Sequence, residues 1–367
     1  MASSRQITTI QAAAILVSSI IGVGVLPLPL FGVHAAESGA PLITLISTLI
    51  ALVGVVLIAL LGMRFPDQSI VQYSENIIGK WPALVGSVMV ICFFAVLTSL
   101  TAREFGEVVI TAVLPRTPVE VTVIVMLLLA AISTRNNITT FAYIHHFYFP
   151  LLLGPALLII ILSLKNADSI NLLPIWGNGN VSMKDTIDGT LTIAALFQSS
   201  FVLTIVVPAM RRPSRALQAS IWAVVIAGGL YVTIVLANVS VFGAEEIKNL
   251  LWPTLELAKA TSLPANVLER LDAAFLAVWV TAVFTTLFST YFLTIKELGN
   301  LFHFKDHRML SFFLLPVVFL LAMLPQNILQ MYDVISRIGQ VGLCVTIGYP
   351  ALLLILALVR GKRGDRC

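Results

Sequence analysis

The stretch that decides the fold is residues 20–27, which read Ile-Ile-Gly-Val-Gly-Val-Leu-Pro. It lies in a run from Ile7 to Ala36 that contains no Asp, Glu, Lys or Arg. A helix that crosses a bilayer must satisfy its backbone N–H and C=O groups internally, because the hydrocarbon offers no water. Two glycines and a proline weaken that helix at mid-membrane depth, which is tolerable where the freed backbone lines a cavity. Broken helices of this kind mark substrate sites in secondary transporters, so the sequence predicts a binding site here.

Composition sets the class of protein. Of 367 residues, 58% are hydrophobic and 11% are charged, against about 25% charged in an ordinary soluble domain. This balance predicts an all-α polytopic membrane protein in contact with lipid. The basic residues lie beside apolar segments, so we expect no binding of nucleic acid. The three cysteines are too few and too scattered for a disulfide framework or a zinc site, and we expect neither a metal nor a cofactor.

Ten apolar segments approach the roughly 20 residues that cross a bilayer. They cover about residues 8–35, 41–63, 82–113, 119–133, 138–164, 186–210, 216–242, 268–295, 309–323 and 338–359. We expect a single transmembrane domain over residues 1–367, built from about ten helices.

The basic residues predict the orientation of these helices. With ten spans, both termini lie on one side of the membrane. The loops on that side hold 14 Lys and Arg residues, and the loops on the other side hold 7. Cytoplasmic loops carry the excess of positive charge, so we expect both termini in the cytoplasm.

A second irregularity lies in the sixth segment, where residues 196–201 read Leu-Phe-Gln-Ser-Ser-Phe. Gln198 and Ser199 can bond to nearby backbone and compete with the helix. Paired interruptions in corresponding halves indicate a 5+5 inverted repeat with a midplane site, here with repeats of about 8–164 and 186–360. The alternative is a continuous helix whose polar residues pack against neighbouring helices.

The two breaks suggest the chemistry of a ligand. The outer half of the first span begins near Val23, and the N-terminus of a half-helix favours a carboxylate. Gly22 and Gly24 would let the ligand reach the backbone, and carbonyl groups at the half-helix ends would accept an ammonium. No acidic residue occupies either break, which is compatible with a small, neutral ligand.

Other spans offer candidate walls for this pocket. Thr281 and Thr285 are four residues apart in the eighth segment, and Phe94 and Thr98 have the same spacing in the third. Each pair shares one helix face, so either could contact a ligand or an ion. The alternative for each residue is packing between helices.

His145 and His146 are adjacent ionisable residues within the fifth segment. Titratable groups inside a membrane are functional candidates, and histidine titrates near neutral pH. One of them could relay protons in an ion-coupled transporter. The alternative is a pair at the membrane interface, because the helix begins near Ile138, about 11 Å from His145 by helical rise.

Several stretches together resemble one family, the B subunits of spore germinant receptors in endospore-forming Firmicutes. The order and spacing of the pieces carry the resemblance over nearly the whole chain. They are Gln11 with residues 21–29, Phe-Pro-Asp-Gln-Ser at 65–69, Gly-Lys-Trp at 79–81, Asn-Leu-Leu-Pro at 171–174, Trp-Pro-Thr at 252–254, and Glu-Arg-Leu-Asp at 269–272 with Trp279.

The resemblance implies the amino acid–polyamine–organocation superfamily, a LeuT-like fold with broken helices 1 and 6, and a location in the spore inner membrane. It implies a subunit that senses nutrients such as amino acids, together with an A subunit and a lipoprotein C subunit. The pocket of that family lies between spans 1, 3, 6 and 8, which corresponds here to Gly22, Gly24, Phe94, Thr98, Phe197 and Thr281.

Two functions remain open from the sequence. In the first, a nutrient binds at the breaks, shifts the bundle between two states, and partner subunits transmit the signal. A ligand can do this only through different affinities for the two states. In the second, the chain is an ion-coupled amino acid transporter. The sequence holds no hydrolase or NTPase motif, and we expect no enzyme.

Overall fold

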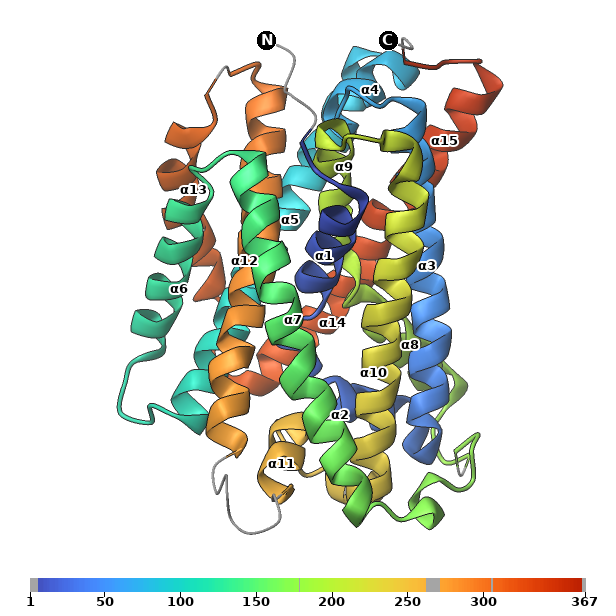
Figure 1. The fold of residues 1–367 in the computed structure, drawn as a ribbon, viewed down its shortest axis with the longest axis vertical. Coiled ribbons are helices and arrows are strands. Elements are labelled where there is room, and N and C mark those ends of the chain that lie inside the picture. The colour runs from blue at the N-terminus through green and yellow to red at the C-terminus, as the bar shows by residue number, and fades with distance from the viewer. Residues whose placement is uncertain (1–5, 178, 262–270, 305, 365–367) are drawn as a thin grey trace.

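The structure is a bundle of helices, most of which run along one long axis (Figure 1). It is a computed structural model that describes residues 6–177, 179–261, 271–304 and 306–364, with only the backbone at Leu271 and Asp272. The start expected for the eighth span and the Glu269-Arg270 part of the family motif lie outside these residues. Within the described residues, extended pairing is limited to one isolated bridge between Ile7 and Met210.

The described residues contain ten long or short apolar helical segments, in agreement with the sequence prediction of about ten spans. Seven helical segments of the described residues are long and apolar enough to span a bilayer, and three shorter apolar helices accompany them. The short ones are α1 (Thr9–Ile20), α6 (Val119–Ser133) and α13 (Arg308–Ala322). The helix α1 is short because it is the first half of the broken first span. The prediction of an all-α polytopic membrane protein is confirmed.

The remaining helices form the two interrupted spans, the other long spans and two short helices. The first span continues with η1 (Val23–Val25) and α2 (Leu28–Ala36), and the sixth consists of α8 (Met183–Ala195), η5 (Gln198–Val202), α9 (Leu203–Val206) and η6 (Val207–Ala209). The other long helices are α3 (Ala40–Arg64), α5 (Lys80–Ala112), α7 (Ile138–Ser163), α10 (Ala216–Ile247) and α12 (Leu271–Leu301). The short helices α4 (Ile70–Ile78) and α11 (Pro253–Ala260) lie at opposite ends of the bundle (Figure 1).

The last span begins earlier than expected. It runs through α14 (Ile328–Leu343), a π-helical turn (Cys344–Gly348) and α15 (Tyr349–Val359). Asn327 caps its start by accepting a hydrogen bond from the Gln330 N–H at 2.9 Å. The first ten residues of α14 carry Asp333 and Arg337, which is why hydropathy alone placed the start near residue 338.

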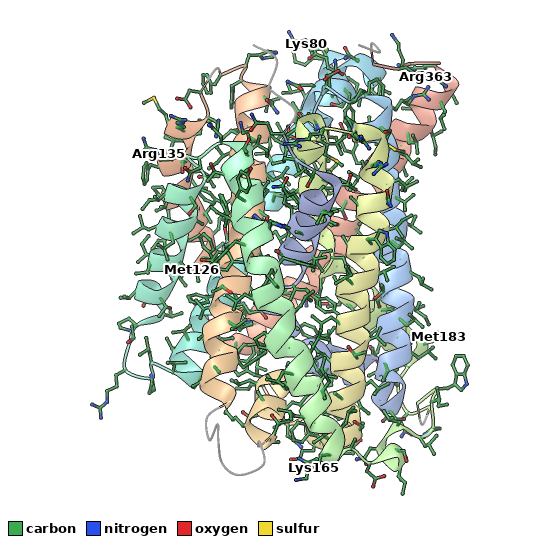
Figure 2. All side chains as sticks on the ribbon, viewed as in Figure 1. Lys80, Met126, Arg135, Lys165, Met183 and Arg363 are labelled. Atoms are coloured by element: carbon green, nitrogen blue, oxygen red, sulfur yellow. The ribbon has the colours of Figure 1, made fainter. Side chains whose placement is uncertain are left out.

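Both ends of the chain lie at the same end of the bundle (Figure 1). Lys80 and Arg363 are at that end, and Lys165 is at the opposite end (Figure 2). The arrangement agrees with an even number of spans and with the assignment of these basic residues to opposite sides.

The long helices α3 and α10 pack against each other through small residues. A Cβ added at Gly228 of α10 would lie 2.2 Å from Cγ2 of Thr48 in α3, whereas a Cβ at the next residue, Gly229, would meet nothing within 4 Å. Gly228 therefore sets how closely the two helices approach, and Gly229 does not.

We expect Gly228→Ala to lower the stability of the protein and Gly229→Ala to preserve or raise it. Overpacking costs about 1–3 kcal/mol, whereas alanine in place of glycine within a helix gains about 0.5–1 kcal/mol. Thermal unfolding of the purified protein in detergent measures the difference. Equal effects of the two substitutions would contradict the close contact at Gly228.

Candidate ligand site at the broken helices

The first break leaves three carbonyl groups at the end of α1 without helical partners, and side chains of other helices bond to them. Thr286 Oγ1 donates to the Ser19 carbonyl at 2.9 Å. Thr285 Oγ1 lies 2.9 Å from the Ser18 carbonyl and 2.8 Å from the Ala282 carbonyl of its own helix, so these two acceptors share its proton. Tyr231 Oη of α10 donates to the Ile20 carbonyl at 2.7 Å. All three hydroxyl-bearing residues are buried. The break is thus fastened to α12 and α10.

The outer side of the same break is fastened to α11. Thr254 Oγ1 donates to the Val25 carbonyl at 2.8 Å, and the Thr254 N–H donates to the Leu26 carbonyl at 3.4 Å. The freed backbone that the sequence indicated is present, and these carbonyl groups already accept hydrogen bonds from the protein.

The two glycines of the break are required by close approach. A Cβ at Gly22 would lie 2.2 Å from Oγ1 of Thr286, and a Cβ at Gly24 would lie 2.8 Å from Cδ2 of Leu196. Gly22 therefore lets α12 reach the end of α1, and Gly24 lets the sixth span pack against the first.

The second break is also present, so the alternative of a continuous sixth helix is wrong. The helix α8 ends at Ala195, and a 3-10 segment begins at Gln198. Gln198 Nε2 donates to the Gly339 carbonyl of α14 at 2.7 Å. Gln198 Oε1 is buried and has no hydrogen-bond partner in the described part of the chain.

The two breaks border one cavity of about 60 Å³. A cavity needs about 10–15 Å³ on this measure to hold one water molecule, so the space matches a small molecule comparable in size to a few water molecules. Four of the predicted ligand-binding residues line it, namely Gly22, Gly24, Gln198 and Ser199. The lining also includes Leu97, Thr101, Glu104, Thr192, Tyr231 and Thr286.

The other predicted ligand-binding residues lie outside this lining and contact protein. Thr285 bonds to α1 as described above, and Thr281 Oγ1 bonds to the Val278 carbonyl of its own helix at 2.6 Å. Thr98 Oγ1 donates to Thr290 Oγ1 at 2.9 Å. The rings of Phe94 and Phe201 are 5.1 Å apart, and those of Phe197 and Tyr231 are 5.2 Å apart.

Sequence reasoning missed Glu104, an acidic residue in the cavity. It is 6% exposed, and its Oε1 atom has no hydrogen-bond partner within the described residues. Its neighbours Arg103 and Glu107 form an ion pair of 2.7 Å with each other. The absence of acidic residues from the breaks themselves therefore did not mean an uncharged site, because α5 brings a carboxyl group from outside them.

A larger vestibule of about 870 Å³ adjoins the cavity through Thr192, which lines both. It is lined by parts of α2, α8 and α14 and by residues 248–251, and these elements lie toward the end opposite the termini (Figure 1).

Lys248, in the lining of this vestibule, lies 2.6 Å from Glu245 and 3.6 Å from Glu37. The hydrogen bond to Glu245 is the main cause that raises the pKa of Lys248, and the Glu37 carboxylate adds to it. Thr192 is thus the lining residue that the charged vestibule shares with the cavity.

The two histidines have different surroundings. His145 is fully buried, and its Nδ1 donates to the Phe141 carbonyl at 2.9 Å. Its Nε2 lies 2.8 Å from Ser289 Oγ, which lies 2.6 Å from Ser19 Oγ of α1. His146 is exposed on the surface of the bundle. Only His145 is therefore connected to the first break.

Comparison with known proteins places the chain in context. The profile of a family described as spore germination protein matches residues 6–331. The spore germination protein YndE of Bacillus subtilis (strain 168) is 25% identical over 364 residues, which cover 99% of both chains. Spore germination protein B2 of the same organism is 24% identical over 367 residues, covering 99% of this chain and 98% of its own.

A solved structure confirms the fold expected from the sequence. The crystal structure of MhsT in complex with L-phenylalanine superimposes with a TM-score of 0.68, covering 98% of this chain and 91% of that chain at 13% identity. At this identity the likeness is one of fold. It supports the LeuT-like arrangement with interrupted first and sixth spans.

We expect Thr286→Val to destabilise the protein more than Thr281→Val. The first substitution leaves the Ser19 carbonyl without its donor, whereas the second removes a bond within one helix. Hydrogen bonds between membrane helices contribute about 0.6 kcal/mol on average and up to about 1.7 kcal/mol. Thermal unfolding in detergent compares the two variants, and equal losses would show that the bond to the break contributes nothing particular.

Proposed function

Because the chain belongs to the spore germination protein family, we propose that it is the nutrient-sensing B subunit of a germinant receptor. In this proposal a small molecule such as an amino acid binds in the cavity between the two broken helices. The observation that carries the proposal is that one small cavity borders Gly22 and Gly24 of the first break together with Gln198 and Ser199 of the second. The solved neighbour MhsT holds an amino acid, L-phenylalanine, which supports this class of ligand.

The way the breaks are held supports a sensing mechanism. The first is bonded to α10 and α12, and the second is bonded to α14 through Gln198. A ligand between them contacts elements that belong to different parts of the bundle. If the two parts have two relative positions, the ligand shifts the equilibrium toward the position in which it has more contacts.

The proposal extends to location and partners. We place the chain in the spore inner membrane with both termini in the cytoplasm, and the 14 to 7 distribution of basic residues supports that orientation. An A subunit and a lipoprotein C subunit would transmit the signal. The chain itself would bind and change conformation without catalysing a covalent reaction.

We expect Leu97→Trp to abolish the response of spores to their nutrient. Leu97 lines the cavity, and an indole ring there would occupy the space of the ligand. The matched control is Cys92→Trp, on the exposed side of the same helix, which should leave the response unchanged. The measurement is the fall in optical density of spores that carry each variant, over a range of nutrient concentrations.

For this comparison, the two variants must be present in the spore membrane in equal amounts. A normal response of the Leu97→Trp spores would contradict the cavity as the binding site. A loss in both variants would show that any large residue on α5 disrupts the protein, and it would likewise remove the support for the cavity.

A second candidate function is proton-coupled transport, and the environment of His145 favours it. The carbonyl of Phe141 only accepts, so Nδ1 carries a proton, and Nε2 faces both Ser289 Oγ and the Thr285 carbonyl at 3.2 Å. When Nε2 is protonated, the hydroxyl groups can form a directed chain from His145 through Ser289 and Ser19 to the Ile15 carbonyl. Proton binding at His145 would thereby act on α1 near the break.

Transport predicts uptake of labelled amino acid against its gradient when the chain alone is reconstituted in vesicles with a proton gradient. His145→Gln should abolish that uptake and His146→Gln should preserve it, because of these two side chains it is His145 that bonds to α12 and, through Ser289, is linked to α1. The measurement is internal label over time with and without the gradient. Absence of concentrative uptake in the wild type would leave the sensor as the better description, and equal effects of the two substitutions would remove the role of His145.

A further inference from the structure

Two buried oxygen atoms in the cavity accept no hydrogen bond from the described residues. They are Oε1 of Glu104, on α5, and Oε1 of Gln198, at the second break. The side chains are 6% and 4% exposed, and both line the same cavity of about 60 Å³. The orientation of the Gln198 amide is fixed, because its Nε2 donates at 2.7 Å to a carbonyl, which cannot donate in return. The free Gln198 oxygen is therefore an acceptor, and the free Glu104 oxygen is an acceptor when its carboxyl group is ionised.

No described residue donates a hydrogen bond to either atom, although Nε of Arg103 is itself a buried donor without a partner. Arg103, next to Glu104 in the sequence, bonds to Glu107 at 2.7 Å. The hydroxyl groups of Tyr231 and Thr286, which also line the cavity, donate to the carbonyls of α1 at 2.7 and 2.9 Å. A hydroxyl has a single proton, so neither can donate to Glu104 or Gln198 at the same time.

The missing partner is a group that donates several hydrogen bonds and carries positive charge. A buried carboxylate without a partner is costly, because burial removes water and the protein offers no replacement. A primary ammonium has three N–H donors and no acceptor, and it neutralises a carboxylate. It therefore fits a site with one carboxyl and one amide oxygen, whereas a hydroxyl or a carboxylate in the same position would leave the charge uncompensated.

We propose that Glu104 and Gln198 form an ammonium subsite in this cavity, and that the ligand is a small primary amine comparable in size to a few water molecules. The size follows from the volume of the cavity. The subsite rests on the proposed function, since it names the class of molecule that the sensor takes. Glycine, alanine and serine carry such a group and are close to this size.

The test compares amines with matched molecules that have a hydroxyl in place of the ammonium. The pairs are glycine with glycolate, L-alanine with L-lactate, and L-serine with L-glycerate. The thermal unfolding of the purified full chain in lipid nanodiscs is measured with each compound over a range of concentrations. At least one amine should stabilise the wild type at a concentration ten times lower than its hydroxy acid, because hydrogen bonds to charged groups are the stronger ones.

Glu104→Gln should raise the concentration of that amine needed for the same stabilisation at least tenfold. The control is Glu297→Gln, which makes the same change at a buried glutamate on α12. Glu297 accepts hydrogen bonds from Ser69 and Asn300 at 2.8 and 3.1 Å. It lies outside the lining of the cavity. This control variant should respond to the amine as the wild type does.

Each other outcome overturns the ammonium subsite. These outcomes are equal stabilisation by amines and hydroxy acids, an unchanged response of the Glu104→Gln variant, or no response of the wild type to any of the amines. If hydroxy acids stabilise the wild type and Leu97→Trp removes that effect, the cavity remains the binding site and only the ammonium subsite fails. If Glu104→Gln does not fold, the comparison of the pairs in the wild type still decides.

Discussion

The bonds from Thr285, Thr286 and Tyr231 to the end of α1 are the interaction on which the rest of the structure depends. Backbone groups left unsatisfied in a membrane cost several kcal/mol each. The first helix can therefore break only where other helices bring hydroxyl groups to its free carbonyls. This requirement fixes the positions of α12 and α10 relative to the break, and the close approach in turn excludes a side chain at residue 22.

The two breaks differ in how they are held. Three side-chain hydroxyls bond to the last carbonyls of α1, and α11 holds the other side of the break. Among the described residues, the second break has one side-chain bond to another helix at its start, from Gln198 to α14. Gln198 also presents its second polar atom to the cavity, so the residue that fastens this break is the one a ligand would contact. The Gln198 side chain would therefore both contact the ligand and hold the second break against α14.

Much of the fold could be predicted because its signals are local. A span needs about 20 apolar residues, and glycine with proline weakens a helix wherever they occur. Hydropathy failed at residues 328–337, where the last helix begins with polar residues that face the vestibule. The site was less predictable because spacing shows which residues share a face, but not which face meets the cavity. Thr281 and Thr285 share a face, yet Thr286, the next residue, lines the cavity.

Glu104 shows most clearly what the sequence could not reveal. The helix α5 has 33 residues, more than a bilayer requires, so the sequence does not determine the depth of any one residue along it. The ion pair between Arg103 and Glu107 is typical of a helix segment that lies at a membrane interface. Glu104 points elsewhere, because residues one apart on a helix differ by about 100°. Packing of α5 against the breaks turns it into the cavity. The site therefore contains a carboxyl group in addition to backbone dipoles, and in the proposed subsite this group would distinguish a cation from a neutral molecule of the same shape.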